Sequence, residues 1–159
     1  MLSKSTSIVK AKTPLYICNM EQHTKESSDY KTISVTQSIE FQDSVVQVLK
    51  NNMILVKFKR NCIVGANHFK VVMQAAHQML NRQKYKVIVC TEPGVTFTKE
   101  GLEYSNSNEH MKYKIAWASV TDNSTKIFFT NLFQSIRSSD VPFKMFKCVD
   151  DAMLWLENT

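Results

Sequence analysis

Glycine and proline are scarce in this chain, with only three of each among 159 residues. Their scarcity excludes collagen, low-complexity linkers and a turn-rich all-β fold. No apolar run approaches the ~20 residues that cross a bilayer, and the N-terminus lacks the apolar stretch of a secretory signal. Neither G-x-G-x-x-G nor G-x-x-x-x-G-K-[ST] occurs, so no phosphate-binding loop is predicted. We therefore expect a protein that is neither secreted nor membrane-spanning.

Cysteine and histidine are present without the spacing of a disulfide framework or a metal site. The four cysteines show no C-x-x-C pattern and accompany eight methionines, which favours reduced thiols and a cytoplasmic location. The four histidines lack metal-ligand spacing, so we expect them to face solvent or a groove. We predict no bound metal and no cofactor. These residues are Cys18, Cys62, Cys90, Cys148, His23, His68, His77 and His110.

Length and composition are those of one globular domain. Hydrophobic residues make up 43% and charged residues 21%, and the formal net charge is +6. This excess lies within the range that keeps a domain soluble, so nucleic acid is not expected as a partner. Residues 1–37 are rich in Ser, Thr and Lys without periodicity, which predicts a poorly ordered N-terminal extension. The regular pattern, and hence the domain, is expected over residues 38–159.

Hydrophobic periodicity predicts alternating strands and helices. Ile54, Val56 and Phe58 share one face of a strand, which predicts an antiparallel hairpin with the β-prone residues 39–48. Apolar residues recur at helical spacing over 65–83 and 127–136, and buried strands are expected at 85–90, 114–120 and 141–146. Thr98 is expected to cap a short helix, and Asp150 and Asp151 to begin the last one. The fold class is α/β: a single layered domain, with an N-terminal antiparallel hairpin, a mostly parallel sheet of four to five strands, and about four helices covering both faces.

Two segments resemble a known family. Val87 to Leu102, read as V-I-V-C-T-E-P-G-V-T-F-T-K-E-G-L, resembles the central motif of STAS domains, the fold of anti-sigma-factor antagonists. There a strand ends in Asp, Gly-Val-x-Phe follows, and Asp-Ser-x-Gly-Leu begins a helix. Ala116 to Leu156 resembles the SpoIIAA-like (STAS/SEC14-type) group of small bacterial proteins, including its closing Ala-x-x-Trp-Leu helix.

The resemblance implies a non-enzymatic regulatory domain that acts by protein contact. It places the partner-binding surface on Gly94, Thr96, Thr98, Lys99, Glu100 and Leu102. Two departures bear on this. Cys90 replaces the Asp at the strand end, and Thr98-Lys99 falls where the phosphorylatable Asp-Ser pair stands. We therefore expect no phosphorylation switch here, and we expect Thr98 to serve as a helix cap.

Other functions are compatible with the sequence. The relation to SEC14-type carriers implies that a lipid or small hydrophobic molecule could bind beside Phe128, Phe129 and Phe133. A small enzyme could use a crevice of Cys90, Glu92 and Asp122 at the strand ends, although a buried structural cysteine explains Cys90 more simply. A basic cluster of Lys57, Lys59 and Arg60 could bind acidic lipid heads or nucleic acid, but a solvated strand end is the simpler interpretation.

Overall fold

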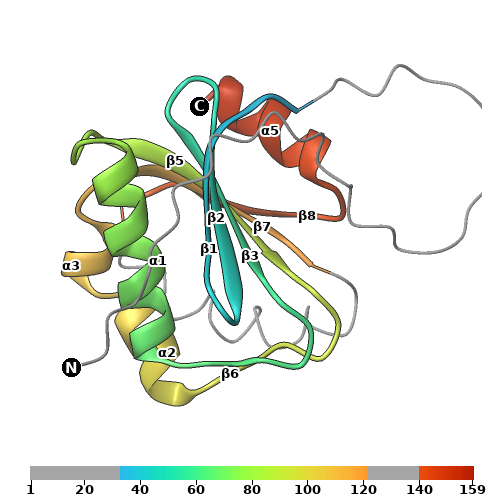
Figure 1. Ribbon diagram of the computed structural model, residues 1–159. Coiled ribbons are helices and arrows are strands. Elements are labelled where there is room, and N and C mark those ends of the chain that lie inside the picture. Colours follow the sequence, from blue (N-terminus) through green and yellow to red (C-terminus); the bar gives the residue numbers. More distant parts are fainter. Residues whose placement is uncertain (1–32, 122–139) are drawn as a thin grey trace, which may run out of the picture.

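A six-stranded sheet forms the centre of the molecule (Figure 1). The structure is a computed structural model that describes residues 33–121 and 140–159. The strands lie side by side in the order β1-β2-β3-β5-β7-β8. They comprise β1 (Val35–Glu40), β2 (Ser44–Leu49), β3 (Met53–Phe58), β5 (Tyr85–Thr91), β7 (Lys114–Val120) and β8 (Phe143–Phe146). The α/β fold class is confirmed.

The sheet is mixed, with an antiparallel part followed by a parallel part. β2 runs antiparallel to both β1 and β3, and β3, β5, β7 and β8 are parallel. Asn51 and Asn52 make the turn between β2 and β3 with φ values of 60° and 54°, which asparagine tolerates better than most residues. β1 begins at Val35, three residues before the expected start of the domain at residue 38.

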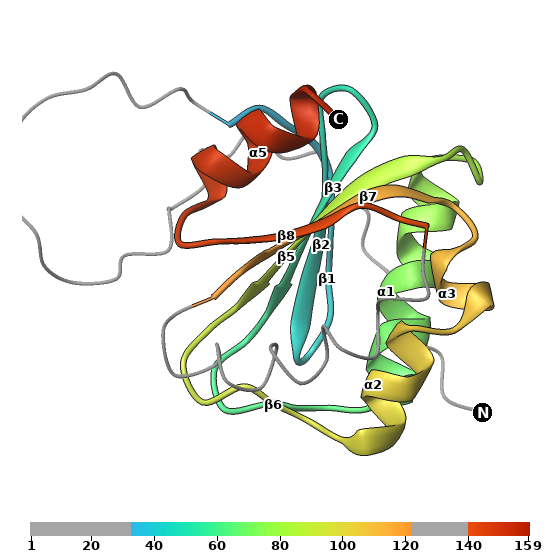
Figure 2. The same ribbon diagram turned by 180° about the vertical axis from the view of Figure 1, so that it is seen from behind.

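Helices cover both faces of the sheet, as Figure 2 shows from behind. One face carries α1 (Ala66–Met79), α2 (Lys99–Ser105) and α3 (Asn108–Met111), and we call it the α1 face. The other carries α5 (Val149–Glu157), and we call it the α5 face. Alternation along the strands supplies one hydrophobic core to each face. Ile54, Val56 and Phe58 enter the core of the α1 face, as their alternation predicts, while Leu55 enters that of the α5 face.

A second, two-stranded parallel sheet lies at the end of α1 where that helix begins. β4 (Ile63–Val64) pairs with β6 (Thr96–Phe97), and Ile63 lies opposite Thr96. The sequence predicts neither strand, because two residues are too few to show a period. The pair joins the loop after β3 to the loop after β5 (Figure 1).

Some predicted boundaries are wrong by a few residues. The helix predicted over 65–83 ends at Met79, because Asn81 and Arg82 adopt left-handed φ values of 49° and 58°. The last strand begins at Phe143, two residues after the predicted start. Asp122, the helix predicted over 127–136 and the extension up to residue 32 lie outside the described residues.

Candidate functional site

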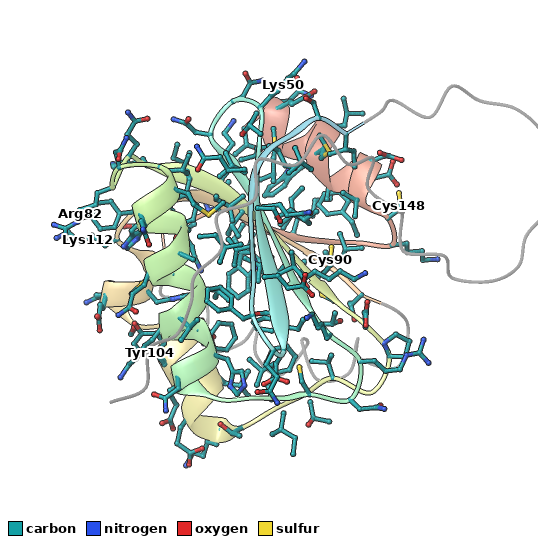
Figure 3. All side chains as sticks on the ribbon, viewed as in Figure 1. Lys50, Arg82, Cys90, Tyr104, Lys112 and Cys148 are labelled. Carbon is teal, nitrogen blue, oxygen red and sulfur yellow. The ribbon has the colours of Figure 1, made fainter. Side chains whose placement is uncertain are left out.

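The predicted strand-end crevice is occupied by structural contacts. Strand register sets Lys57 beside Cys90, and the Cys90 side chain is buried in the core of the α5 face. Glu92 Oε1 accepts from Lys57 Nζ at 2.7 Å, and Glu92 Oε2 accepts from the Arg60 backbone N–H at 2.8 Å. The Lys57 hydrogen bond is the main reason that the pKa of Glu92 lies below its usual value. Both oxygens of Glu92 therefore hold the loop after β3, and Figure 3 shows Cys90 within the sheet.

The basic cluster of Lys57, Lys59 and Arg60 is largely neutralised by its neighbours. Lys57 pairs with Glu92, and Lys59 Nζ lies 2.7 Å from Glu40 Oε1 and 2.8 Å from the Phe41 carbonyl oxygen. Two of the three cations therefore have a carboxylate partner. The cluster stabilises the ends of β1 and β3, and offers little free positive charge to a polyanion.

The residues predicted to bind a partner surround β6. Thr98 caps α2: its Oγ1 accepts a hydrogen bond from the Gly101 N–H at 3.0 Å, as predicted. Thr96, Lys99 and Glu100 are exposed, whereas Leu102 packs partly against the core of the α1 face. The structure thus brings Thr96, Lys99 and Glu100 to one end of the molecule and turns Leu102 inward.

Two glycines fix the position of β6 and of the residues on either side of it. Gly94 has φ +80°, and a Cβ there would lie 2.0 Å from Asn61 Oδ1. Gly101 lies so close to β4 that its Cβ would meet the Val64 carbonyl oxygen at 2.7 Å. The tight turn and the close approach fix β6 and the start of α2 against β4.

An exposed hydrophobic residue completes this end of the molecule. Ile63 on β4 is 65% exposed, and it lies opposite Thr96 on β6. We call the group Ile63, Gly94, Thr96, Lys99 and Glu100 the β4–β6 surface. The sequence does not point to Ile63, because a strand of two residues gives no pattern that assigns its side chain to a face.

A small, partly open cavity lies between the sheet and the helices of the α1 face. Its volume is about 20 Å³. Its walls are mostly apolar, but a lysine, a histidine and an indole also line it. The lining residues are Ile54, Val56, Phe58, Phe69, Val72, Met73, Ala76, Tyr85, Val87, Val89, His110, Lys114 and Trp117.

A bulge in β7 turns Lys114 into this cavity. Tyr85 pairs with Lys114, but the next residue of β5, Lys86, pairs with Ala116, so Ile115 is an extra residue in β7. Regular alternation back from Trp117 would put Ile115 in the core. Instead, Ile115 is 40% exposed and Lys114 only 8% exposed. The strand predicted as buried over 114–120 therefore exposes one of its apolar residues, Ile115.

Two buried nitrogen atoms in the lining of the cavity lack hydrogen-bond partners. His110 Nδ1 and Trp117 Nε1 are buried without a hydrogen bond, and the Lys114 ammonium lies over the Trp117 ring, 4.8 Å from its centroid. Burial lowers the pKa of Lys114 to about 7 and, with the nearby Lys114 charge, moves the pKa of His110 far below its usual value. His110 is 5% exposed, so the expectation that it faces solvent or a groove is wrong.

No signal in the sequence marks Lys114 or His110 as part of a site. His110 lies in the polar stretch Ser105–Lys112, and Lys114 precedes an apolar strand as an ordinary flanking charge would. Only the bulge, a property of strand pairing, brings Lys114 inside. Among residues 33–121 and 140–159, no group of His, Cys, Asp and Glu is arranged to hold a metal ion. Over the same residues, no helix combines the length and apolarity of a membrane span.

Within the described residues, the fold and the sites define a small α/β domain with an exposed loop surface and a small, mostly apolar cavity. The family model of DUF7793, a domain of unknown function, matches residues 47–159. The chain belongs to this family. No curated protein and no solved structure matches the chain.

Proposed function

We propose that the domain is a non-enzymatic regulatory module that binds another protein through the β4–β6 surface. The exposure of Ile63 carries this proposal. A side chain that is 65% exposed on a rigid strand adds apolar contact area without any cost of ordering a loop. The exposed Thr96, Lys99 and Glu100 around it are suited to the polar rim of an interface.

The local packing supports a preformed binding surface. The Thr98 N–H donates to the Val64 carbonyl oxygen at 3.0 Å, and the Thr96 N–H donates to the Cys62 carbonyl oxygen at 3.0 Å. With the close approach of Gly101 to β4, these hydrogen bonds hold both strands. The resemblance to STAS domains assigns partner binding to the same loop, and it is part of the proposal.

The two other candidate functions have less support. An enzyme at the strand ends would need Glu92, whose carboxylate is held by Lys57 and the Arg60 backbone. A lipid carrier would need room for an acyl chain, and the cavity of the α1 face is about 20 Å³. A water molecule requires roughly 10–15 Å³ of such space, so the cavity admits only a very small molecule.

The test compares Ile63 with a second exposed hydrophobic residue. Leu154 on α5 is 60% exposed, and α5 lies at the opposite end of the molecule from β6 (Figure 1). Tagged wild-type, Ile63→Asp and Leu154→Asp proteins are used for quantitative affinity purification from the native cell. We expect a protein that is retained by the wild type and Leu154→Asp and is lost with Ile63→Asp.

The dissociation constant of the purified pair then decides the outcome. We expect Ile63→Asp to weaken binding at least about tenfold, the effect of about 1.4 kcal/mol. Circular dichroism checks that both variants are folded. The proposal is wrong if Ile63→Asp retains every partner, or if Leu154→Asp loses the same partner to the same extent.

A further inference from the structure

The cavity of the α1 face combines features of a ligand site. We propose that it binds a small organic carboxylate, of the size of formate or acetate, with Lys114 as the cationic partner and His110 and Trp117 beside it. The inference rests on the bulge, on the unpartnered nitrogen atoms and on the size and lining of the cavity. It is independent of the β4–β6 surface.

The bulge destabilises the fold at two adjacent residues. It exposes Ile115 to 40% and buries Lys114 to 8% exposure, each the reverse of what the side chain prefers. A regular strand would reverse both placements. Bulges that redirect a side chain are frequent beside functional sites. Residues placed in environments that destabilise the fold also tend to occur at such sites. The burial of Lys114 is therefore explained by a ligand more readily than by packing.

The nitrogen atoms around the cavity need an acceptor. Trp117 Nε1 is a donor only, and a protonated Lys114 is a donor only. His110 Nδ1 and Trp117 Nε1 have no hydrogen-bond partner within the described residues, and the side chains of Lys114, His110 and Trp117 are all at least nine-tenths buried. No Asp or Glu is among the described residues that line the cavity. A carboxylate from solution would supply both the missing negative charge and two acceptor oxygens.

The rest of the cavity limits the size of the acid. A space of about 20 Å³ is only slightly larger than the roughly 10–15 Å³ that one water molecule requires, so the acid must be among the smallest. Val56, Val72 and Ala76 form apolar walls that suit the hydrogen of formate or the methyl group of acetate. Chloride carries the same charge but has neither the planar pair of oxygens nor an apolar end, so we expect it to bind more weakly.

Among the described residues that line the cavity, Lys114 should be the only one that titrates between pH 6 and pH 9. Burial lowers the pKa of His110 on α3 far below this range and raises the pKa of Tyr85 on β5 above it. The pKa of His77 on α1 is lowered by burial and by Arg82 and Lys112, and the pKa of Tyr104 on α2 is raised. A carboxylate binds the protonated amine, so its affinity should fall as the pH rises above about 7.

The test uses the two tryptophans as reporter and internal control. Trp117 lines the cavity, whereas Trp155 packs on the α5 face. Sodium acetate and sodium formate are titrated into ¹⁵N-labelled protein at pH 6 and constant ionic strength, with sodium chloride as the balancing salt. We expect the indole N–H signal of Trp117 to shift and saturate while that of Trp155 stays in place. Trp155→Phe assigns the two signals.

Two further measurements decide between binding and a nonspecific salt effect. Lys114→Met shortens the side chain by one atom, removes the charge and should fold well, since an apolar residue in a buried site is favourable. We expect it to abolish the acetate response, and we expect the affinity of the wild type to fall about tenfold or more between pH 6 and pH 9. The proposal is overturned if Trp117 does not respond, if chloride acts equally, or if Lys114→Met still binds.

Discussion

Lys114 is the residue whose environment differs most from what its side chain prefers. It is 8% exposed, its ammonium group lies over the face of the Trp117 ring, and the described lining of the cavity offers it no carboxylate. A cation–π contact in a desolvated site contributes about 2 kcal/mol, less than the penalty of several kcal/mol for burying an ion. The empty form of the protein should therefore be destabilised by this residue.

The stability effect of Lys114 should depend on pH. Its pKa is about 7 in the folded protein and 10.5 as a free group, so between these values the unfolded chain binds more protons. The free energy of unfolding should therefore rise with pH across that window, by up to about 5 kcal/mol in all. Below pH 7 the full cost of burying the charged Lys114 applies. We expect Lys114→Met to raise the free energy of unfolding most at pH 6 and little at pH 10.

Urea denaturation of both proteins at pH 6, 8 and 10 in chloride buffer checks this. The difference between variant and wild type removes the contributions of other titrating groups such as Tyr85. A difference that stays constant with pH would show that Lys114 keeps its usual pKa in the folded protein. Trp155→Phe, on the other face of the sheet, should show such a constant difference.

Among the elements, α2 depends on an unusually close approach to β4. A Cβ at Gly101 would lie 2.7 Å from the Val64 carbonyl oxygen and 3.0 Å from Gly65 Cα, both backbone atoms. Backbone held in a short sheet moves less easily than the end of a side chain. The glycine is therefore required here by contact, since α2 itself would be more helical with alanine.

Gly101→Ala should accordingly destabilise the protein, although the same change in an exposed helix stabilises by up to about 1 kcal/mol. We expect a loss of roughly 1–3 kcal/mol, typical of overpacking, in chemical denaturation. Glu103→Ala on the exposed side of the same helix is the control and should change stability by less than about 0.5 kcal/mol. An increase in stability for Gly101→Ala would contradict the close packing of α2 on β4.

Long periodic elements could be predicted from the sequence, whereas short or irregular ones could not. The alternation of Ile54, Val56 and Phe58 correctly predicts a strand with a face in the core, and Thr98 correctly predicts the start of α2. The strands β4 and β6 are too short to carry a period, so the sheet that presents Ile63 was not expected. The end of α1 was misplaced because left-handed Asn81 and Arg82 follow it without glycine or proline.

The candidate sites were harder to predict than the elements for a physical reason. Side-chain placement in β7 depends on an extra residue in its pairing with β5, which reverses the inward and outward positions of Lys114 and Ile115. Periodicity alone gives the opposite assignment. Conversely, the sequence shows that Glu92 follows a strand, but it does not show that Lys57, a residue of another strand, holds its carboxylate.

At the scale of the whole molecule, the fold separates the three cysteines of the described residues into accessible and protected thiols. Cys148 precedes α5 and is exposed, while Cys62 and Cys90 are 8% and 5% exposed. Cys90 lies in β5, which has a strand on each side. Its reaction with a reagent in solution should therefore require a large opening of the domain.

We expect a thiol reagent at neutral pH to modify Cys148 at least about a hundredfold faster than Cys90, measured by peptide-resolved mass spectrometry. Low concentrations of urea should accelerate Cys90 labelling in parallel with global unfolding. Rapid and preferential modification of Cys90 in the native protein would contradict this protection and would favour the thiol-enzyme hypothesis.

The order of strands in the main sheet has a consequence for biosynthesis. Position in the sheet follows position in the chain from β1 to β8, so no later strand is inserted between two earlier ones. As the polypeptide leaves the ribosome, each newly emerged strand of this sheet meets a free edge left by its predecessor. The sheet can therefore be assembled during translation by successive addition at one side, without reopening any pairing already made.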